Sequence, residues 1–304
     1  MSDWHLPSDK QVNPVMTQAT HSHLIAGYRP QAFEHASNWA RQLLVFVLIA
    51  TIGLPIFWIA ITAFKIPREV YTLDHALVFT PTLDNFRILF EHPWNLHLKL
   101  LNSAFVAITT VAIAVPCALM AAYSFSRFEF PFKRSLFVLV IASQFIPGAV
   151  VVLPYFLMFK EIGLLDTRTA LILINLSIVM PYAVWMIKGF IDAVPIEIEE
   201  SAKVDGASAL RVIWQIVVPA ALPGVITAAV FSFTLTWNEF LFALILTKQD
   251  ALTLPLGLIG FRTERGDLWE LMAATGILIT VPMFLISLAV QKQFIQSLTA
   301  GSVR

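Results

Sequence analysis

Six long apolar segments constrain this chain more than any other feature of its sequence. Each is long enough to cross a hydrocarbon layer of about 30 Å as a helix, which takes about 20 residues. Backbone groups in lipid have no water to bond, so such segments must satisfy them internally and form helices. The sequence therefore predicts an all-α integral membrane protein with six transmembrane helices. They lie approximately at residues 43–64, 101–123, 136–159, 169–187, 222–246 and 271–290.

The composition supports this class. The chain is 58% hydrophobic and 13% charged, whereas soluble domains are about 45–50% apolar and about 25% charged. A net charge of zero gives no reason to expect a nucleic-acid partner. The sequence divides into a polar tail, residues 1–40, and a six-helix domain, residues 41–304. The tail contains His21 and His23, but its composition is more typical of a solvated segment than of a metal site, and no metal is expected.

Lysines and arginines indicate the orientation. An even number of spans places both termini on one side of the membrane. Segments on the N-terminal side carry slightly more positive residues, and the short loop 127–134 alone contains Arg127, Lys133 and Arg134. Because positive residues concentrate in short cytoplasmic loops, both termini are predicted to be cytoplasmic.

Few polar side chains interrupt the apolar segments. Glu239 is the clear ionisable exception, and it is expected to face the bundle interior or water. Gln144, Asn175 and Asn238 are the other polar candidates. These four residues could line a substrate path or could form hydrogen bonds between helices. The scarcity of carboxylates argues against a proton-driven pump.

One polar, acid-rich stretch, residues 194–219, separates the fourth and fifth apolar segments. Pro195 favours the start of a short helix, and negative charge in the first turn favours it further. The acids that follow are Glu197, Glu199 and Glu200. Gly206 can adopt the left-handed conformation that ends a helix, and Ser208 can cap a second helix. The sequence therefore predicts two short helices around a glycine turn, hereafter the knob.

Within the knob, a pattern resembles the EAA motif of the permease subunits of bacterial ABC importers. The family pattern is E-A-A-x3-G-x9-I-x-L-P, and its spacing is matched from Glu200 through Gly206 to Pro219. Ser201 and Val218 are the two departures. Further stretches resemble the carbohydrate, maltose-type branch of that family. They are F-T-P-T-L-D-N-F at 79–86, L-N-S-A at 101–104, A-A-Y-S-F-S-R-F at 121–128, G-L-L-D-T at 163–167 and W-N-E-F at 237–240.

The resemblance implies a type I ABC importer permease fold and import of a carbohydrate across the bacterial inner membrane. In that family the knob, within a loop at about residues 189–219, is a coupling helix that enters a cleft of a cytoplasmic ATPase. Glu200 would pair with a basic residue of that ATPase. The ATPase-coupling set implied here is Glu199, Glu200, Ser201, Ala202, Asp205, Gly206 and Pro219.

The resemblance also implies partners. They are a second permease subunit, forming a heterodimer, two ATPase subunits, and a periplasmic or lipid-anchored solute-binding protein, all around a chain embedded in lipid. The chain itself is expected to be neither an enzyme nor a cofactor carrier. It has no P-loop motif, so ATP and Mg would be bound by the ATPase. The outer loop 248–270 is expected to touch the solute-binding protein because it is long and mixes apolar and charged residues.

Other functions remain open at this stage. The same importer class could carry a polyol, glycerol phosphate or another small solute. A secondary transporter would work without an ATPase, but the acidic knob and the few buried charges count against it. An intramembrane enzyme is disfavoured because the sequence contains neither H-E-x-x-H nor G-x-S-x-G.

Overall fold

The computed structural model describes residues 31–264 and 266–300. The predicted tail therefore lies outside the described residues up to residue 30, together with His21 and His23. From Gln31 onward it is helical, since α2 spans Gln31–Thr62. The chain divides into two units, Met1–Phe57 and Trp58–Arg304. The first unit contributes most of α2, and the second contains every other described element.

Four helices are long and apolar enough to cross a membrane unbroken. They confirm the first, second, fourth and sixth predicted segments within a few residues at most ends. The candidate spans are Arg41–Thr62 of α2, all of α5 (Leu96–Arg127), all of α8 (Arg168–Asp192), and Trp269–Gln291 within α14 (Trp269–Ala300).

The third predicted segment, 136–159, is not one continuous helix. It consists of α6 (Lys133–Ala142), a 3₁₀ turn η2 (Ser143–Phe145) and α7 (Gly148–Glu161), with a 96° bend between the two halves. Pro147 explains the break, because a residue before proline avoids the helical region. Ile146 is accordingly extended, with ψ of 117°.

The fifth predicted segment, 222–246, is also wrong in extent. Here α12 (Leu222–Trp237) ends early, and α13 (Leu241–Leu246) is a separate short helix. Upstream, α12 is joined through an 80° bend to a preceding helical stretch, Ala209–Ala220. That stretch comprises α10 (Ala209–Val212), a π-helical turn η3 (Ile213–Val217) and α11 (Val218–Ala220). Counting each bent pair as one span gives the predicted six.

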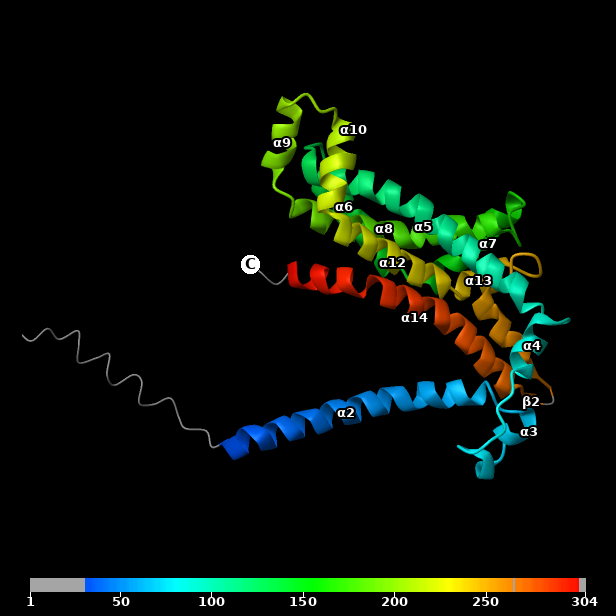
Figure 1. Cartoon of the computed structure of the whole chain (residues 1–304). Coiled ribbons are helices and arrows are strands. Elements are labelled where there is room, and N and C mark those ends of the chain that lie inside the picture. The colour runs from blue at the N-terminus through cyan, green and yellow to red at the C-terminus, as the bar shows by residue number, and fades with distance from the viewer. Residues whose placement is uncertain (1–30, 265, 301–304) are drawn as a thin grey trace, which may run out of the picture. The chain divides into compact units, whose positions relative to one another are not determined.

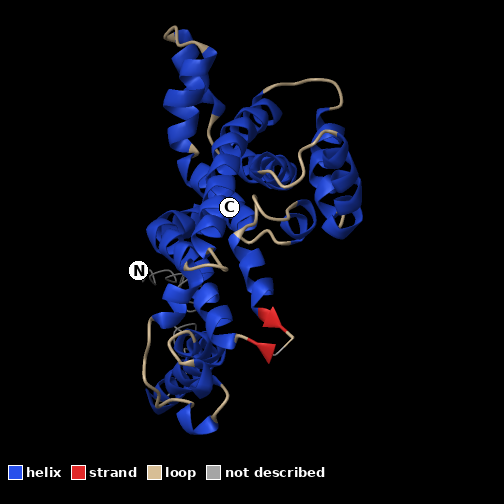
Figure 2. Ribbon diagram, turned by 90° about the vertical axis from the view of Figure 1, so that its right-hand side faces the viewer, coloured by secondary structure: helices blue, strands red, loops and turns tan. Residues whose placement is uncertain are grey.

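Shorter elements occupy the two ends of the second unit. At one end, α9 (Ile196–Val204) and α10 project beyond the bundle, and the two strands lie at the opposite end (Figures 1 and 2). The strands form an antiparallel pair in which Arg262 faces Asp267. The remaining short elements are α3 (Pro67–Val70), η1 (Leu73–His75), α4 (Asp84–Phe90), η4 (Leu254–Phe261), β1 (Arg262–Thr263) and β2 (Gly266–Asp267).

The helices α5, α8 and α12 pack against one another and form the centre of the second unit. Small residues line their contacts and are fully buried: Ala118, Ala122, Ala183 and Ala228. Small side chains let helix backbones approach closely, which is how helices associate where lipid removes the hydrophobic driving force. At the knob end, Ile187, Ile191 and Val212 join the same cluster.

Gly224, near the start of α12, lies directly against the Phe190 side chain of α8. A Cβ built there would lie 2.2 Å from Cγ of Phe190 and 2.6 Å from its Cβ, whereas one built at Gly189 meets nothing within 4 Å.

We expect Gly224→Ala to destabilise the protein by about 1–3 kcal/mol, because the Phe190 ring must move. The matched control, Gly189→Ala, should be neutral or slightly stabilising. Thermal unfolding in detergent measures both, and equal melting temperatures would contradict this packing.

Candidate functional site

The knob has the two-helix form that the sequence predicts. Its first helix, α9, is followed by Gly206 with φ of +84°, a conformation that glycine adopts without strain. Ser208 then caps α10, its hydroxyl accepting the backbone N–H of Arg211 at 3.4 Å. Pro195 lies one residue earlier than a first-turn position and is the N-cap of α9. The local chemistry of the sequence therefore accounts for the turn.

Most of the predicted coupling residues face outward. The exposed ones are Glu200, Ser201, Asp205, Gly206 and Pro219. Large apolar side chains are exposed beside them, with Val204 at 88%, Leu210 at 60% and Ile198 at 50%. Ala202 is half-buried and packs against the core cluster. An exposed surface that combines acidic and large apolar side chains is typical of a protein-binding site.

Glu199, one of the predicted ATPase-coupling residues, differs from most of the others because it does not face outward. Its side chain is fully buried. Arg127 Nε donates to Glu199 Oε1 at 2.6 Å, and the Tyr123 hydroxyl donates to Oε2 at 3.0 Å. Both carboxylate oxygens are therefore occupied within the chain. Glu199 holds the knob from inside and does not present a charge to a partner.

Arg127 links this carboxylate to a third helix. Its Nη2 donates to the carbonyl of Ile191, in the last turn of α8, at 2.9 Å and to that of Val194, just after α8, at 2.7 Å. Sequence reasoning missed this role, although it noted the stretch 121–128. The available signal was the spacing of Tyr123 and Arg127, since residues four apart share one face of a helix.

Of the four predicted path residues, Gln144 lines a cavity. The cavity has a volume of about 490 Å³ and lies at the break between α6 and α7. Its lining combines aromatic and hydroxyl groups, including Tyr155, Ser177 and Tyr182. The Tyr155 hydroxyl lies 3.4 Å from the Ser177 hydroxyl. A cavity with several hydroxyl groups and an amide can bind a neutral polar molecule.

The other three predicted path residues do not line this cavity. Asn175 is 2% exposed, and its Nδ2 donates to the Leu171 carbonyl of its own helix at 2.8 Å. Asn238 donates to the Thr234 carbonyl at 2.9 Å. Glu239 accepts the backbone N–H groups of Phe242 at 2.7 Å and Ala243 at 3.0 Å, so it caps α13. The structure thus gives these three side chains local backbone partners.

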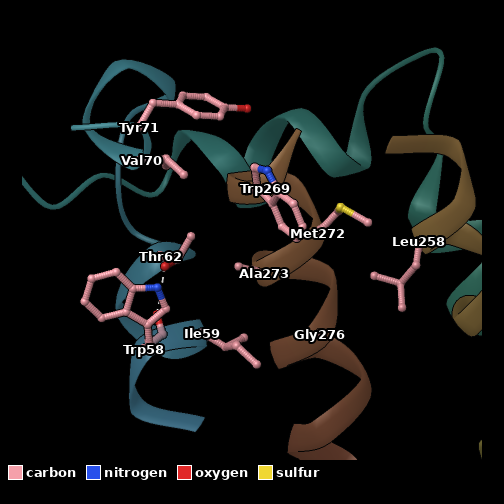
Figure 3. A pocket seen from close by; sticks show the side chains of 10 residues that line it. All are labelled: Trp58, Ile59, Thr62, Val70, Tyr71, Leu258, Trp269, Met272, Ala273 and Gly276. Carbon is pink, nitrogen blue, oxygen red and sulfur yellow. Dashed lines mark hydrogen bonds between the residues drawn. The ribbon is translucent and has the colours of Figure 1, made fainter. Parts of the chain in front are cut away.

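A second cavity, of about 560 Å³, lies between the last turns of α2 and the start of α14 (Figure 3). Its two hydroxyls are engaged: Thr62 donates to the Trp58 carbonyl at 2.8 Å, and Tyr71 donates to the Asp267 carbonyl at 2.5 Å. The rest of its lining is apolar apart from the indole rings of Trp58 and Trp269. This cavity therefore suits a polar solute less well than the cavity beside Gln144.

The loop 248–270, which the sequence predicts to lie on the outer side, is extensively packed and hydrogen-bonded. Leu254 and Phe261, at the two ends of η4, are fully buried, and Leu254 N–H donates to the Ser103 hydroxyl at 2.8 Å. Asn102 Nδ2 donates to the carbonyls of Asp250 and Leu252, both at 2.9 Å. The L-N-S-A stretch thus anchors this loop. The described residues of the β1–β2 hairpin are its more exposed part.

Asp166 clamps the same loop from the other side. Its carboxylate accepts the backbone N–H groups of residues 248–251 at 2.9–3.2 Å. Partial burial raises the pKa of the Asp166 carboxyl, but the four backbone N–H groups outweigh it, and the pKa lies below its ordinary value. The aspartate of the G-L-L-D-T stretch therefore has a structural role, because its carboxylate binds four consecutive backbone N–H groups of the loop.

We expect Asp166→Asn to release this clamp. Hydrogen exchange of the amides of residues 248–251 should accelerate at neutral pH by about tenfold or more, since charged hydrogen bonds are lost. In the unaltered protein the folded pKa is depressed. The stabilisation should therefore be complete above the unfolded pKa of about 3.9 and be lost as the pH falls through the lower folded value. Asp250→Asn, in the same loop, is the control and should leave exchange unchanged. Equal protection in both variants would exclude the clamp.

Comparisons with known proteins agree with this geometry. The chain is 32% identical over 272 residues to the trehalose transport system permease protein SugB of Mycobacterium tuberculosis, covering 88% of this chain and 98% of that protein. It is 30% identical over 275 residues to the galactooligosaccharides transport system permease protein GanQ of Bacillus subtilis, covering 88% and 97%.

A solved structure shares the fold. It is the crystal structure of a bacterial ABC transporter involved in the import of the acidic polysaccharide alginate, with a TM-score of 0.71 and 18% identity over 88% of this chain and 98% of that chain. The family model for the binding-protein-dependent transport system inner membrane component matches residues 114–299. This chain is therefore a multi-pass membrane protein that belongs to that family.

Proposed function

We propose that this chain is the transmembrane permease subunit of an ABC importer that carries a carbohydrate across the bacterial inner membrane. A permease subunit is not itself catalytic, and ATP with Mg would be bound and hydrolysed on a separate ATPase. The observation that carries the proposal is the knob. Two short helices around Gly206 project from the bundle and expose Glu200 beside apolar groups.

The carbohydrate assignment rests on two supports. The relatives SugB and GanQ are named for trehalose and galactooligosaccharides. The cavity beside Gln144 offers hydroxyl and amide groups, and no charged side chain is among its lining residues. A phosphorylated solute such as glycerol phosphate would call for a cation there, so the lining favours a neutral sugar. Its volume lies in the usual range for small-molecule sites, about 300–1,000 Å³.

The partners follow from the two ends of the second unit. The knob end would receive one of two ATPase subunits, with Glu200 pairing with a basic side chain and the exposed Val204 entering the cleft. The basic loop 127–134 lies at that same end, since Arg127 binds Glu199 of the knob. Because positive residues concentrate in short cytoplasmic loops, this supports the proposal that the knob end and both termini are cytoplasmic. The hairpin 262–267 at the opposite end would meet a periplasmic or lipid-anchored solute-binding protein. A second, different permease chain would complete the pathway.

Reconstitution tests the proposal. The chain is purified from its native membrane with its partner subunits, placed in vesicles and supplied with labelled disaccharides, polyols and glycerol phosphate. We expect ATP-dependent uptake of a carbohydrate only. With Glu200→Ala, about tenfold less ATPase subunit should co-purify with the chain, because the substitution breaks a partly buried charge pair between the two proteins. Glu197→Ala, another exposed glutamate of α9, is the control and should recover the normal amount.

Two results would contradict the proposal. Uptake driven by an ion gradient without ATP would indicate a secondary transporter. Equal recovery of the ATPase with both variants would show that Glu200 does not lie at the docking surface.

A further inference from the structure

We propose that Arg127, Glu199 and Tyr123 form a rigid joint that transmits displacement of the knob to α5 and α8. This inference rests on the proposed function, since it concerns how motion imposed by an ATPase would reach the membrane helices. Arg127 and Glu199 act as positioning residues. They make no contact with solute or nucleotide, and their role is to keep the knob and the bundle moving as one body.

The joint connects three helices through one guanidinium. Arg127 is the last residue of α5. Its Nε donates to Glu199 of α9 at 2.6 Å, and its Nη2 donates to the carbonyls of Ile191 in the last turn of α8 and Val194 just after it. Tyr123, one turn earlier in α5, donates to the remaining oxygen of Glu199. A planar guanidinium fixes the directions of its bonds, so the relative angles of the three helices are fixed together.

Burial makes this interaction strong. The side chains of Arg127 and Glu199 are only 10% and 0% exposed, so water competes little for either charge. The cation lies at the C-terminal end of α8 and the anion in the first turn of α9, where each complements the helix dipole. Removing one partner of a buried pair leaves the other charge uncompensated. The other described side-chain ion pairs of this chain join residues four apart in the sequence and tie no two helices together.

The backbone at the knob shows why a joint is needed. Between α8 and α9 the chain passes through residues 193–195, which are not helical, and between α9 and α10 it turns at Gly206. On the far side, the helix through α10 meets α12 at an 80° bend. Each of these points could act as a hinge. A force on α9 would rotate it about these hinges unless another contact opposed the rotation. The Arg127–Glu199 ion pair is that contact.

Glu199→Gln tests the joint, because glutamine keeps the size of the side chain and removes the charge that compensates Arg127. In the reconstituted complex we expect ATP hydrolysis to stay within about twofold while solute carried per ATP falls about tenfold. Tyr123→Phe removes a single hydroxyl and should lower the same ratio by a smaller factor. Glu129→Gln breaks the exposed pair with Lys133. It is the matched control and should change neither quantity.

A second readout needs no transport. In the isolated chain, Glu199→Gln should accelerate hydrogen exchange of the amides of residues 196–204 but not of α12. Two results would overturn the joint: exchange in α9 equal to that of the unaltered chain, or transport and hydrolysis that fall together in proportion to lost folded complex, which would show a structural role only. An unaltered complex without ATP-dependent uptake would refute the proposed function instead, and the exchange experiment would still decide the joint.

Discussion

Polar groups buried among apolar helices need hydrogen-bond partners, and this constraint accounts for the contacts of several buried polar side chains. Glu239 has its carboxylate on the first amides of α13. Asn102 binds two loop carbonyls and also accepts Arg168 Nε at 2.8 Å. Arg127 and Glu199 neutralise each other at the end of three helices. Asn102 and the Arg127–Glu199 pair thus join elements that lie far apart in the sequence, whereas Glu239 bonds within its own segment.

Sequence patterns predicted the class of fold well and its breaks poorly. Hydropathy finds apolar stretches, and four of them are the continuous helices that the structure shows. It does not reveal where an apolar stretch bends. Pro147 breaks its helix, whereas Pro116 and Pro181 lie inside helices that continue through them. A proline within an apolar stretch therefore does not by itself predict where the helix ends.

The candidate site shows a similar limit. Glycine, proline and serine predicted the form of the knob, because their effects are local. The roles of Glu199 and Glu200 could not be separated, since neighbouring residues on a helix point about 100° apart and only the tertiary fold decides which one faces inward. The residue that decides it is Arg127, 72 positions away. In the same way, the sequence grouped Gln144 with Asn175, although only Gln144 lines the cavity.

The proposed joint makes the knob and α5 move as one rigid body. Spin labels at Glu197→Cys and Met120→Cys, both exposed positions, test it most directly after Cys117, the single cysteine, is replaced by serine. Pulsed electron resonance then measures the distance between the labels in the assembled complex, with and without ATP. We predict one narrow distance distribution that is the same in both states. A distribution that shifts or broadens when ATP binds would show that the knob pivots on the bundle, and would contradict the account.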